Sequence, residues 1–307
     1  MRTVSVVVPV YCNSESLPLL FDRLSRIETR LHDVGLLMEL IFVDDGSTDA
    51  SLERLLKIKE ERPATKVIKL SRNFGEFRAS KCGVQFVTGE CFAILAADLQ
   101  DPPELLLEMA RYWIDGTKFV VCVRDSRSDP LLSRVLSGLY YRMLRLLVIP
   151  EYPRGGYDFA LMDRSFLPFL RDSSKNAPIP LLAYSLGFTP AQILYHREQR
   201  QHGSSRWTLR KKFSAFIDAM LGFSTTPIRV VSAIGVSFAL LSFAVSIYTV
   251  IATVLEGAVV PGWASIVALT SFMFGVVIVM LGVIGEYLSR ILSEVNKRPE
   301  VVIDQVY

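Results

Sequence analysis

The chain has 307 residues, with 34 Lys and Arg against 31 Asp and Glu and a formal net charge of +3. A charge so close to balance argues against a nucleic-acid-binding protein with a basic surface, and we expect no nucleic-acid partner. Half of the residues are apolar and 21% are charged, which excludes an intrinsically disordered chain. The four cysteines are spread out without a C-x-x-C pair, so a small disulfide-stabilised domain is also excluded.

Residues 1–165 alternate between short apolar runs and amphipathic runs. Strands are expected at residues 4–8, 40–43, 66–70, 91–96 and 119–123, with helices between them at residues 17–31, 50–60 and 76–87. Strands that are apolar throughout and separated by helices are typical of a mostly parallel sheet covered on both faces. The expected fold class is therefore α/β, and ligands of such sheets bind at the carboxyl ends of the strands.

Polar clusters stand at the ends of three of these strands. They occupy residues 11–15, 44–49 and 98–101. Asp44 and Asp45 place two carboxylates on a tight turn, where they can accept hydrogen bonds from a nucleobase or a ribose. The alternative is that this cluster caps the following helix with Ser47, Thr48 or Asp49, and both roles can hold at once.

The third cluster presents acidic side chains next to two prolines. Asp98 and Asp101 come before Pro102 and Pro103, which fix an extended turn. Carboxylates presented in this way suit Mg²⁺ or Mn²⁺ held together with substrate phosphates, although a helix cap is again the alternative. The chain has no G-x-G-x-x-G after the first strand and no P-loop signature. A dinucleotide oxidoreductase and a P-loop NTPase are therefore disfavoured.

Two long uncharged runs lie near the C-terminus, at residues 230–255 and 257–285. At 1.5 Å per residue the first run is about 39 Å long and exceeds the ~30 Å hydrocarbon core of a bilayer. Pro261 and Gly262 indicate that the second helix begins near Trp263. We expect membrane spans at residues 228–255 and 263–288, because buried helices of soluble proteins rarely run this long without a charge.

Basic residues flank the two spans on one side. Arg229 precedes the first span and Arg290, Lys297 and Arg298 follow the second, whereas the connecting loop has neither Lys nor Arg. The positive-inside rule therefore predicts a two-pass protein integral to the plasma (inner) membrane, with both termini in the cytoplasm.

Residues 197–212 carry six basic side chains and one acidic one, and apolar residues follow at helical spacing. This pattern predicts a basic, amphipathic juxtamembrane segment that contacts membrane lipid, with a plain positive flank as the alternative. The expected order is a cytoplasmic catalytic domain at 1–196, this segment at 197–227, the spans at 228–255 and 263–288 joined by an external loop at 256–262, and a cytoplasmic tail at 289–307.

Four motifs resemble, in order and spacing, the family 2 glycosyltransferases with a GT-A fold. They are VVVPVY at residues 6–11, VDDGSTD at 43–49, RNFG at 72–75 and ADLQDPPE at 97–104. Further motifs at residues 155–164, 200–207 and 296–299, together with the two spans, resemble the polyprenyl-phosphate branch of this family. That branch includes dolichol-phosphate mannose synthase-like enzymes and bacterial bactoprenol glucosyltransferases, and the resemblance covers essentially the whole chain.

The resemblance implies roles for the residues that match. The nucleotide-sugar pocket would comprise Pro9, Tyr11, Asp44, Asp45, Arg72, Asn73, Asp98, Arg200 and Arg206. Asp98 would hold the divalent metal, Gln100 would lie next to the sugar diphosphate, and Asp158 would lie near the reaction centre, which makes these three the catalytic candidates. The lipid phosphate would be held by Arg124, Arg134 and, as a weaker candidate, Ser137.

Two positions depart from the family pattern. Ala96 stands where the first carboxylate of a D-x-D motif is usual, so the metal or ribose contact of that carboxylate is missing. The first loop reads Tyr11-Cys12-Asn13 where Y-N-E is usual, so an amide replaces a carboxylate near the nucleotide.

The implied activity is transfer of a hexose from a UDP-sugar, with UDP-glucose favoured, to a polyprenyl phosphate with inversion at the anomeric carbon. The family also suggests a homo-oligomer and a place in the modification of lipopolysaccharide or another cell-surface glycan. Other donors such as UDP-aminoarabinose or GDP-mannose stay open. So do a processive polysaccharide synthase and, because of Ala96, a nucleotide-sugar-binding membrane protein that has lost catalysis.

Overall fold

A computed structural model of the chain describes residues 1–124, 131–174, 177–196, 220, 222–256, 262–296 and 299–307. The chain divides into two units, which are Met1–Ala219 with Pro299–Tyr307, and Met220–Arg298. The segment at 197–219 and residues 257–261 of the connecting loop lie outside the described residues.

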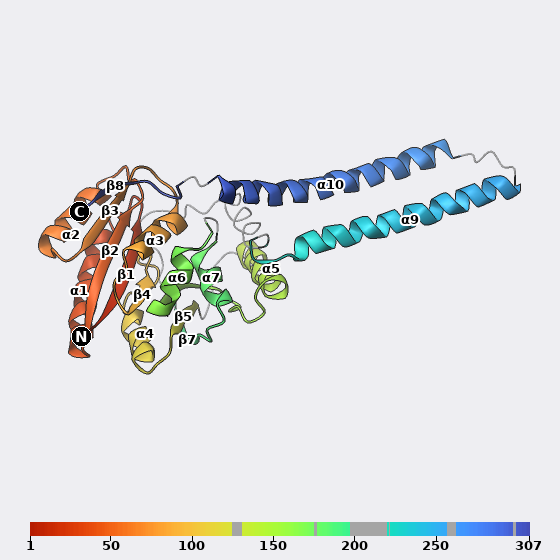
Figure 1. The fold of residues 1–307 in the computed structure, drawn as a ribbon. Coiled ribbons are helices and arrows are strands. Elements are labelled where there is room, and N and C mark those ends of the chain that lie inside the picture. The colour runs from red at the N-terminus through yellow and green to blue at the C-terminus, as the bar shows by residue number, and fades with distance from the viewer. Residues whose placement is uncertain (125–130, 175–176, 197–219, 221, 257–261, 297–298) are drawn as a thin grey trace. The chain divides into compact units, whose positions relative to one another are not determined.

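Within the described residues of the first unit, eight strands form one sheet in the order β7-β5-β6-β4-β1-β2-β3-β8 (Figure 1). The strands are β1 (Arg2–Val10), β2 (Leu36–Asp44), β3 (Lys66–Leu70), β4 (Cys91–Ile94), β5 (Phe119–Arg124), β6 (Tyr157–Asp163), β7 (Ala191–Tyr195) and β8 (Ile303–Val306). β1 is parallel to β2 and β4, β2 to β3, and β5 to β7. β6 is antiparallel to β4 and β5, and β8 is antiparallel to β3. The α/β fold with a mostly parallel sheet is confirmed.

Helices connect these strands and supply most of the remaining core. They are α1 (Leu17–Asp33), α2 (Ser51–Glu61), α3 (Glu76–Gln85), α4 (Leu105–Ile114), α5 (Leu131–Leu147), α6 (Leu167–Arg171) and α7 (Ile179–Ser185), with a short 3-10 turn η1 (Arg164–Phe166) before α6. The apolar spacing expected at residues 17–31 is the buried face of α1, which comprises Leu17, Leu20, Leu24, Ile27 and Leu31.

From Val6 to Val10 the central strand β1 is apolar and buried, because helices cover both of its faces. Val6 and Val8 belong to the core cluster that includes the buried residues of α1 and α4. Val7 points to the other face, since successive side chains of a strand alternate. There α3 packs so closely that a Cβ built on Gly83 would lie 2.3 Å from Cγ1 of Val7.

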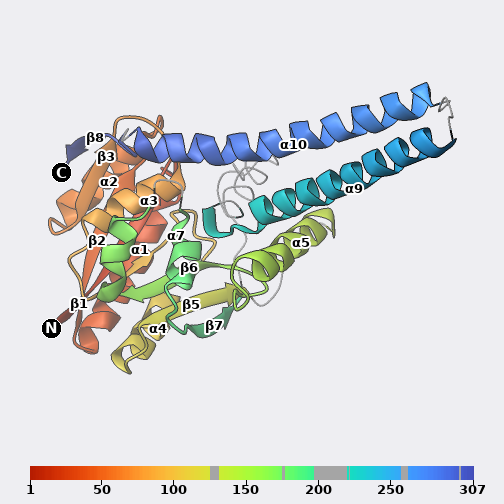
Figure 2. The same ribbon diagram turned by 45° about the vertical axis from the view of Figure 1, so that its right-hand side comes forward.

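The second unit contains two long apolar helices, α9 (Thr226–Glu256) and α10 (Trp263–Val295), which run side by side (Figures 1 and 2). They contact each other through the rings of Phe238 and Phe272, whose centroids are 5.6 Å apart. Windows at Ile228–Val245 and Phe272–Ser289 are long and apolar enough to cross a membrane, by length and composition. Large apolar side chains stay exposed along both helices, which indicates membrane association.

The C-terminal residues form a strand that no pattern in the sequence predicted. α10 continues to Val295, and residues 303–306 of the expected tail pair with β3 at the edge of the sheet. The N–H of Tyr307 donates to the carbonyl of Val67 at 2.8 Å, and the N–H of Ser71 donates to the carbonyl of Val302 at 2.9 Å. The chain that leaves α10 therefore covers the edge of β3, where unpaired backbone groups would otherwise be exposed.

A buried lysine fixes the segment that leads into β8. Lys81 is 5% exposed, and its Nζ donates to the carbonyls of Ser173 and Ser174 at 2.6 and 3.2 Å. It also pairs with Oε1 of Glu300 at 2.8 Å. A buried ammonium needs such partners, because desolvating an unpaired charge is costly.

We expect Glu300→Gln to lower the free energy of unfolding by about 1–3 kcal/mol, because it removes the only carboxylate that pairs with Lys81 among the described residues. Thermal unfolding of the purified protein followed by circular dichroism measures the change. Asp304→Asn is the matched control, since it removes the partner of the more exposed Lys69 and should shift the midpoint less. Equal shifts in the two variants would contradict the role given to Glu300.

Candidate active site

The loops that follow β1 and β2 are joined by hydrogen bonds at the carboxyl end of the sheet. The N–H of Cys12 donates to Oγ of Ser47 at 2.9 Å, and the N–H of Asn13 donates to Oγ of Ser51 at 2.7 Å. Two of the polar clusters expected from the sequence therefore lie together. Pro9, in the register position opposite Val43, and the partly exposed Tyr11 belong to the same end of β1.

Asp45 joins the end of β2 to the loop after β3. Its carboxylate is buried and accepts from the N–H groups of Phe74 at 2.7 Å and Gly75 at 2.8 Å, one on each oxygen. Burial raises the pKa of Asp45, and the two backbone donors oppose that rise. Each oxygen already has a protein partner, so Asp45 fixes the loop that carries Arg72 and Asn73.

Asp44 stabilises the turn itself. Its Oδ1 accepts from the N–H of Ser47 at 3.2 Å, and burial raises the pKa of this carboxyl group. The helix cap considered for the cluster is not formed, because the N-cap residue of α2 is Ala50 and no side chain caps it. Asp49 instead accepts on Oδ1 from the N–H of Ser51, the first residue of α2, so different carboxylates stabilise the turn and the start of the helix.

Gly46 lets the two loops approach each other. Its φ is +66°, and a Cβ at this position would lie 2.5 Å from the carbonyl carbon of Arg72 and 2.8 Å from the nitrogen of Asn73. The guanidinium of Arg72 in turn lies over the ring of Phe74, 4.2 Å from its centroid. Residues 44–47 and 72–75 are therefore one packed unit.

The loop after β4 presents Asp98 and Gln100. Leu99 has a φ of 59° and is 1% exposed, so its buried side chain anchors a bend between two partly exposed polar residues. Oδ1 of Asp98 accepts from the N–H of Gln100 at 3.2 Å. Oγ of Ser16 donates to the carbonyl of Ala97 at 2.7 Å and joins this loop to the start of α1.

A divalent cation fits this loop only if substrate phosphates and water supply its other ligands. Within the ranges that the structure describes, no group of three or more His, Cys, Asp or Glu side chains could hold a metal ion. Mg²⁺ is commonly held by one or two carboxylates together with substrate phosphates and water. Asp98 can supply that carboxylate, while Ala96 supplies none.

Arg124 and Asp158, expected at the acceptor and the reaction centre, form an ion pair. Arg124 ends β5, next in register to Tyr195 at the end of β7, and Asp158 belongs to β6. Tyr195 donates from its hydroxyl to the buried carboxylate of Asp101 and also hydrogen-bonds with Arg124. Sequence reasoning missed Tyr195, because nothing in an alternating strand distinguishes it from an ordinary buried residue.

Arg134 and Ser137 lie on α5, where the structure describes the backbone but not these side chains. Arg200 and Arg206 lie outside the described residues. Aromatic rings hold α5 in place. The rings of Tyr141 and Tyr152 stack at 6.2 Å, and Tyr152 packs against Tyr157, the residue before Asp158.

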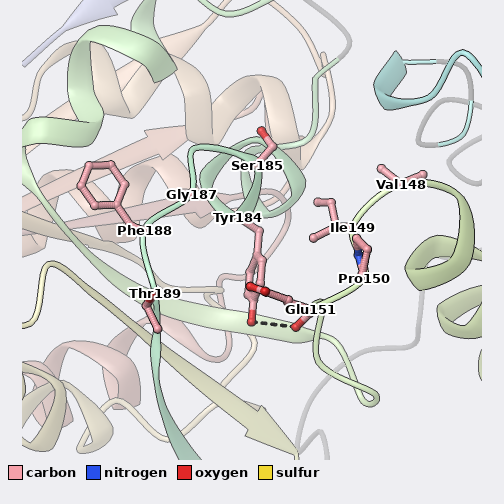
Figure 3. A pocket seen from close by; sticks show the side chains of 9 residues that line it. All are labelled: Val148, Ile149, Pro150, Glu151, Tyr184, Ser185, Gly187, Phe188 and Thr189. Atoms are coloured by element: carbon pink, nitrogen blue, oxygen red, sulfur yellow. Dashed lines mark hydrogen bonds between the residues drawn. The ribbon is translucent and has the colours of Figure 1, made fainter.

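A hollow of about 300 Å³ adjoins these rings (Figure 3). It is lined by residues 148–151, which follow α5, and by residues of the segment 184–189. The hydroxyl of Tyr184 donates to the carbonyl of Glu151 at 3.1 Å across it. No motif in the sequence indicated this hollow.

We expect Gly46→Ala to destabilise the protein more than Gly35→Ala. Both glycines have positive φ, which costs about 1–2 kcal/mol for another residue, but a Cβ on Gly35 meets nothing within 4 Å. The difference in free energy of unfolding between the variants isolates the contact with the Arg72 backbone. Equal losses would mean that the two loops are not packed through Gly46.

Comparison with known proteins identifies the family. The model of glycosyl transferase family 2 matches residues 5–171. An uncharacterized glycosyltransferase of Synechocystis sp. is 32% identical over 99% of this chain and 95% of its own length. The undecaprenyl-phosphate 4-deoxy-4-formamido-L-arabinose transferase of Yersinia pestis is 30% identical over 100% of this chain and 94% of its own length.

Among solved structures, mannosyl-3-phosphoglycerate synthase of Rubrobacter xylanophilus has a similar fold, with a TM-score of 0.52 at 17% identity over 71% of each chain. The family match covers more than half of the chain, and relatives match it almost from end to end. With the α/β sheet and the loops at its carboxyl edge, these similarities lead to one conclusion: the chain belongs to glycosyl transferase family 2 and has a GT-A fold.

Proposed function

We propose that the protein transfers one hexose from a nucleotide sugar to a polyprenyl phosphate at the cytoplasmic face of the plasma membrane. The observation that carries the proposal is that one chain combines two features. They are the packed loops at residues 44–47 and 72–75, whose motifs resemble nucleotide-sugar-binding loops, and two helices of membrane length. A sugar nucleotide is soluble and a polyprenyl phosphate is not. The enzyme that joins them must therefore work at a membrane surface.

The donor side of the site would be the packed loops with Asp98 and Gln100. A divalent cation held at Asp98 would offset the negative charge of the diphosphate, and Mg²⁺ and Mn²⁺ both suit this carboxylate. We favour UDP-glucose as the donor because of the motifs that resemble bactoprenol glucosyltransferases. The relative from Yersinia pestis is named for a different sugar, so a panel of donors decides between them.

The acceptor side would include Arg124, with Arg134 and Ser137 on α5. The name of the same relative states undecaprenyl phosphate as its acceptor, which supports a polyprenyl phosphate here. Arg124 is 14% exposed at its side chain and already offers a guanidinium at the carboxyl edge of the sheet. Guanidinium groups bind phosphate oxygens in a bidentate manner.

The proposed reaction is a single displacement. A phosphate monoester has a second pKa near 6, so the lipid phosphate is largely ionised at neutral pH and needs no strong general base. Its oxygen attacks the anomeric carbon and the bond to the nucleoside diphosphate breaks. Asp158 would orient the acceptor through Arg124, and Arg200 and Arg206 would offset charge on the departing diphosphate.

Incubation of the purified protein with radiolabelled nucleotide sugars and a short polyprenyl phosphate tests the proposal. Label should enter the organic phase with UDP-glucose or another hexose donor such as GDP-mannose, whereas label from UDP-aminoarabinose would show that the transferred sugar is a pentose. A protein that binds donors but leaves all label in the aqueous phase would match the alternative in which Ala96 marks lost catalysis, and the proposal would be wrong.

Asp98→Asn should lower metal-dependent transfer on the order of 10²-fold, because it removes the carboxylate that offsets diphosphate charge. The initial rate at saturating donor and metal measures this loss. Asp22→Asn is the control, since Asp22 forms an exposed pair with Arg26 on α1 and its loss should leave the rate unchanged. Undiminished transfer by Asp98→Asn would remove Asp98 from the metal site.

An α-linked donor should give a β-linked lipid product, because one displacement inverts the anomeric centre. The coupling constant of the anomeric proton in the NMR spectrum of the product distinguishes the two configurations. Retention of configuration would rule out the single displacement.

A further inference from the structure

The ends of β5 and β7 place a tyrosine beside the arginine of the acceptor side. These strands are parallel and in register, and Arg124 and Tyr195 are their last paired residues. Side chains at paired positions of neighbouring strands point to the same face of a sheet. The two side chains are hydrogen-bonded to each other, in agreement with this placement.

The direction of these hydrogen bonds follows from the chemistry of the three groups. A guanidinium only donates, an ionised carboxylate only accepts, and a phenol has one proton to give. The phenol proton of Tyr195 goes to Oδ1 of Asp101, so the phenol oxygen must accept from Arg124. Burial and the neighbouring carboxylate raise the pKa of Tyr195, which keeps this phenol protonated at neutral pH.

The far end of this chain of hydrogen bonds lies in the donor-side loop. Asp101 is 3% exposed and stands three residues after Asp98, on the far side of the bend at Leu99. A hydrogen-bonded connection therefore runs from the loop that carries Asp98 to the guanidinium of Arg124. This connection includes Tyr195 of β7, a strand that no sequence motif had linked with either substrate.

Arg124 keeps donors to spare for a ligand. Its guanidinium pairs with Asp158 and donates to Tyr195, while no acceptor faces its buried Nε in the part of the chain that the structure describes. With five N–H donors, a guanidinium held on two sides can still offer donors to a phosphate. The hydrogen bond from Arg124 to Tyr195 thus fixes the orientation of the guanidinium without using all of its N–H donors.

We propose that Tyr195 and Asp101 are positioning residues that orient Arg124 toward the acceptor phosphate. The inference rests on the proposed function, in which Arg124 binds that phosphate. Neither residue is assigned to donor binding. Asp101 belongs to the same motif as Asp98, but it acts through Tyr195 on the acceptor.

Tyr195→Phe tests this directly, because it keeps the ring and removes the oxygen that receives the Arg124 donor. The KM for polyprenyl phosphate should rise about tenfold, the size of one hydrogen bond to a charged group, while the KM for the nucleotide sugar stays within about twofold. Tyr184→Phe is the matched control: it also removes a tyrosine hydroxyl that donates to a protein oxygen, but one whose partners are the backbone of Glu151 and the side chain of Gln192, and it should change neither KM.

Asp101 provides a second, graded test. Asp101→Asn keeps an oxygen that can accept from Tyr195, so it should raise the acceptor KM less than Asp101→Ala. Because the wild-type enzyme is assayed alongside, failure of the wild type to label the lipid would refute the proposed function. If the wild type transfers sugar, equal changes in both KM values, or none, would overturn the positioning role alone.

A double-mutant cycle completes the test, with Tyr195→Phe and Arg124→Gln measured singly and together. If Tyr195 acts through Arg124, its removal should have little further effect on the acceptor KM once Arg124 is gone. Additive effects would show that Tyr195 acts independently of Arg124 and would contradict the inference.

Discussion

The proposed donor side of the site depends on one buried carboxylate. Asp45 accepts a backbone N–H on each oxygen, and these two hydrogen bonds fix the loop after β3 against the turn after β2. Gly46 then brings the turn into contact with the backbone of Arg72. A parallel sheet delivers its loops to one edge but does not determine how they pack. Here that packing comes from backbone amides and a buried carboxylate, which hold the two loops rigidly together.

The proposed acceptor side is built differently, because an antiparallel strand lies between two parallel parts of the sheet. β6 pairs with β4 on one side and with β5 on the other, so Asp158 of β6 reaches Arg124 at the end of β5. Tyr195 and Asp101 then connect this arginine with the loop after β4. The two substrates of a transferase must be aligned closely, because a misplacement of about 1 Å can slow the reaction about 10²-fold. A hydrogen-bonded connection between the loops proposed to bind them is a direct means of achieving this.

The sequence allowed accurate prediction wherever burial alone decides the structure. Continuous apolar runs located the central strands, and the spacing of Leu17 to Leu31 located the buried face of α1, because these patterns depend only on which face is covered. The pairing of β8 with β3 could not be read from the sequence, since it joins residues over 200 positions apart at a sheet edge. The partners of Asp45 and Tyr195 were equally hidden. The partners of Asp45 are two backbone amides of the loop after β3, and those of Tyr195 are side chains on β5 and on the loop after β4. A single sequence shows neither set of contacts.

The reaction proposed for this family 2 glycosyltransferase adds one sugar to one lipid phosphate. Mass spectrometry of the lipid product, together with the amount of nucleoside diphosphate released in the same reaction, measures this stoichiometry. We expect a single product that is heavier than the acceptor by one sugar residue, formed in a 1:1 ratio with the nucleoside diphosphate. A ladder of longer products would indicate a processive synthase, and nucleoside diphosphate release without acceptor would indicate hydrolysis. Either result would rule out the proposed reaction.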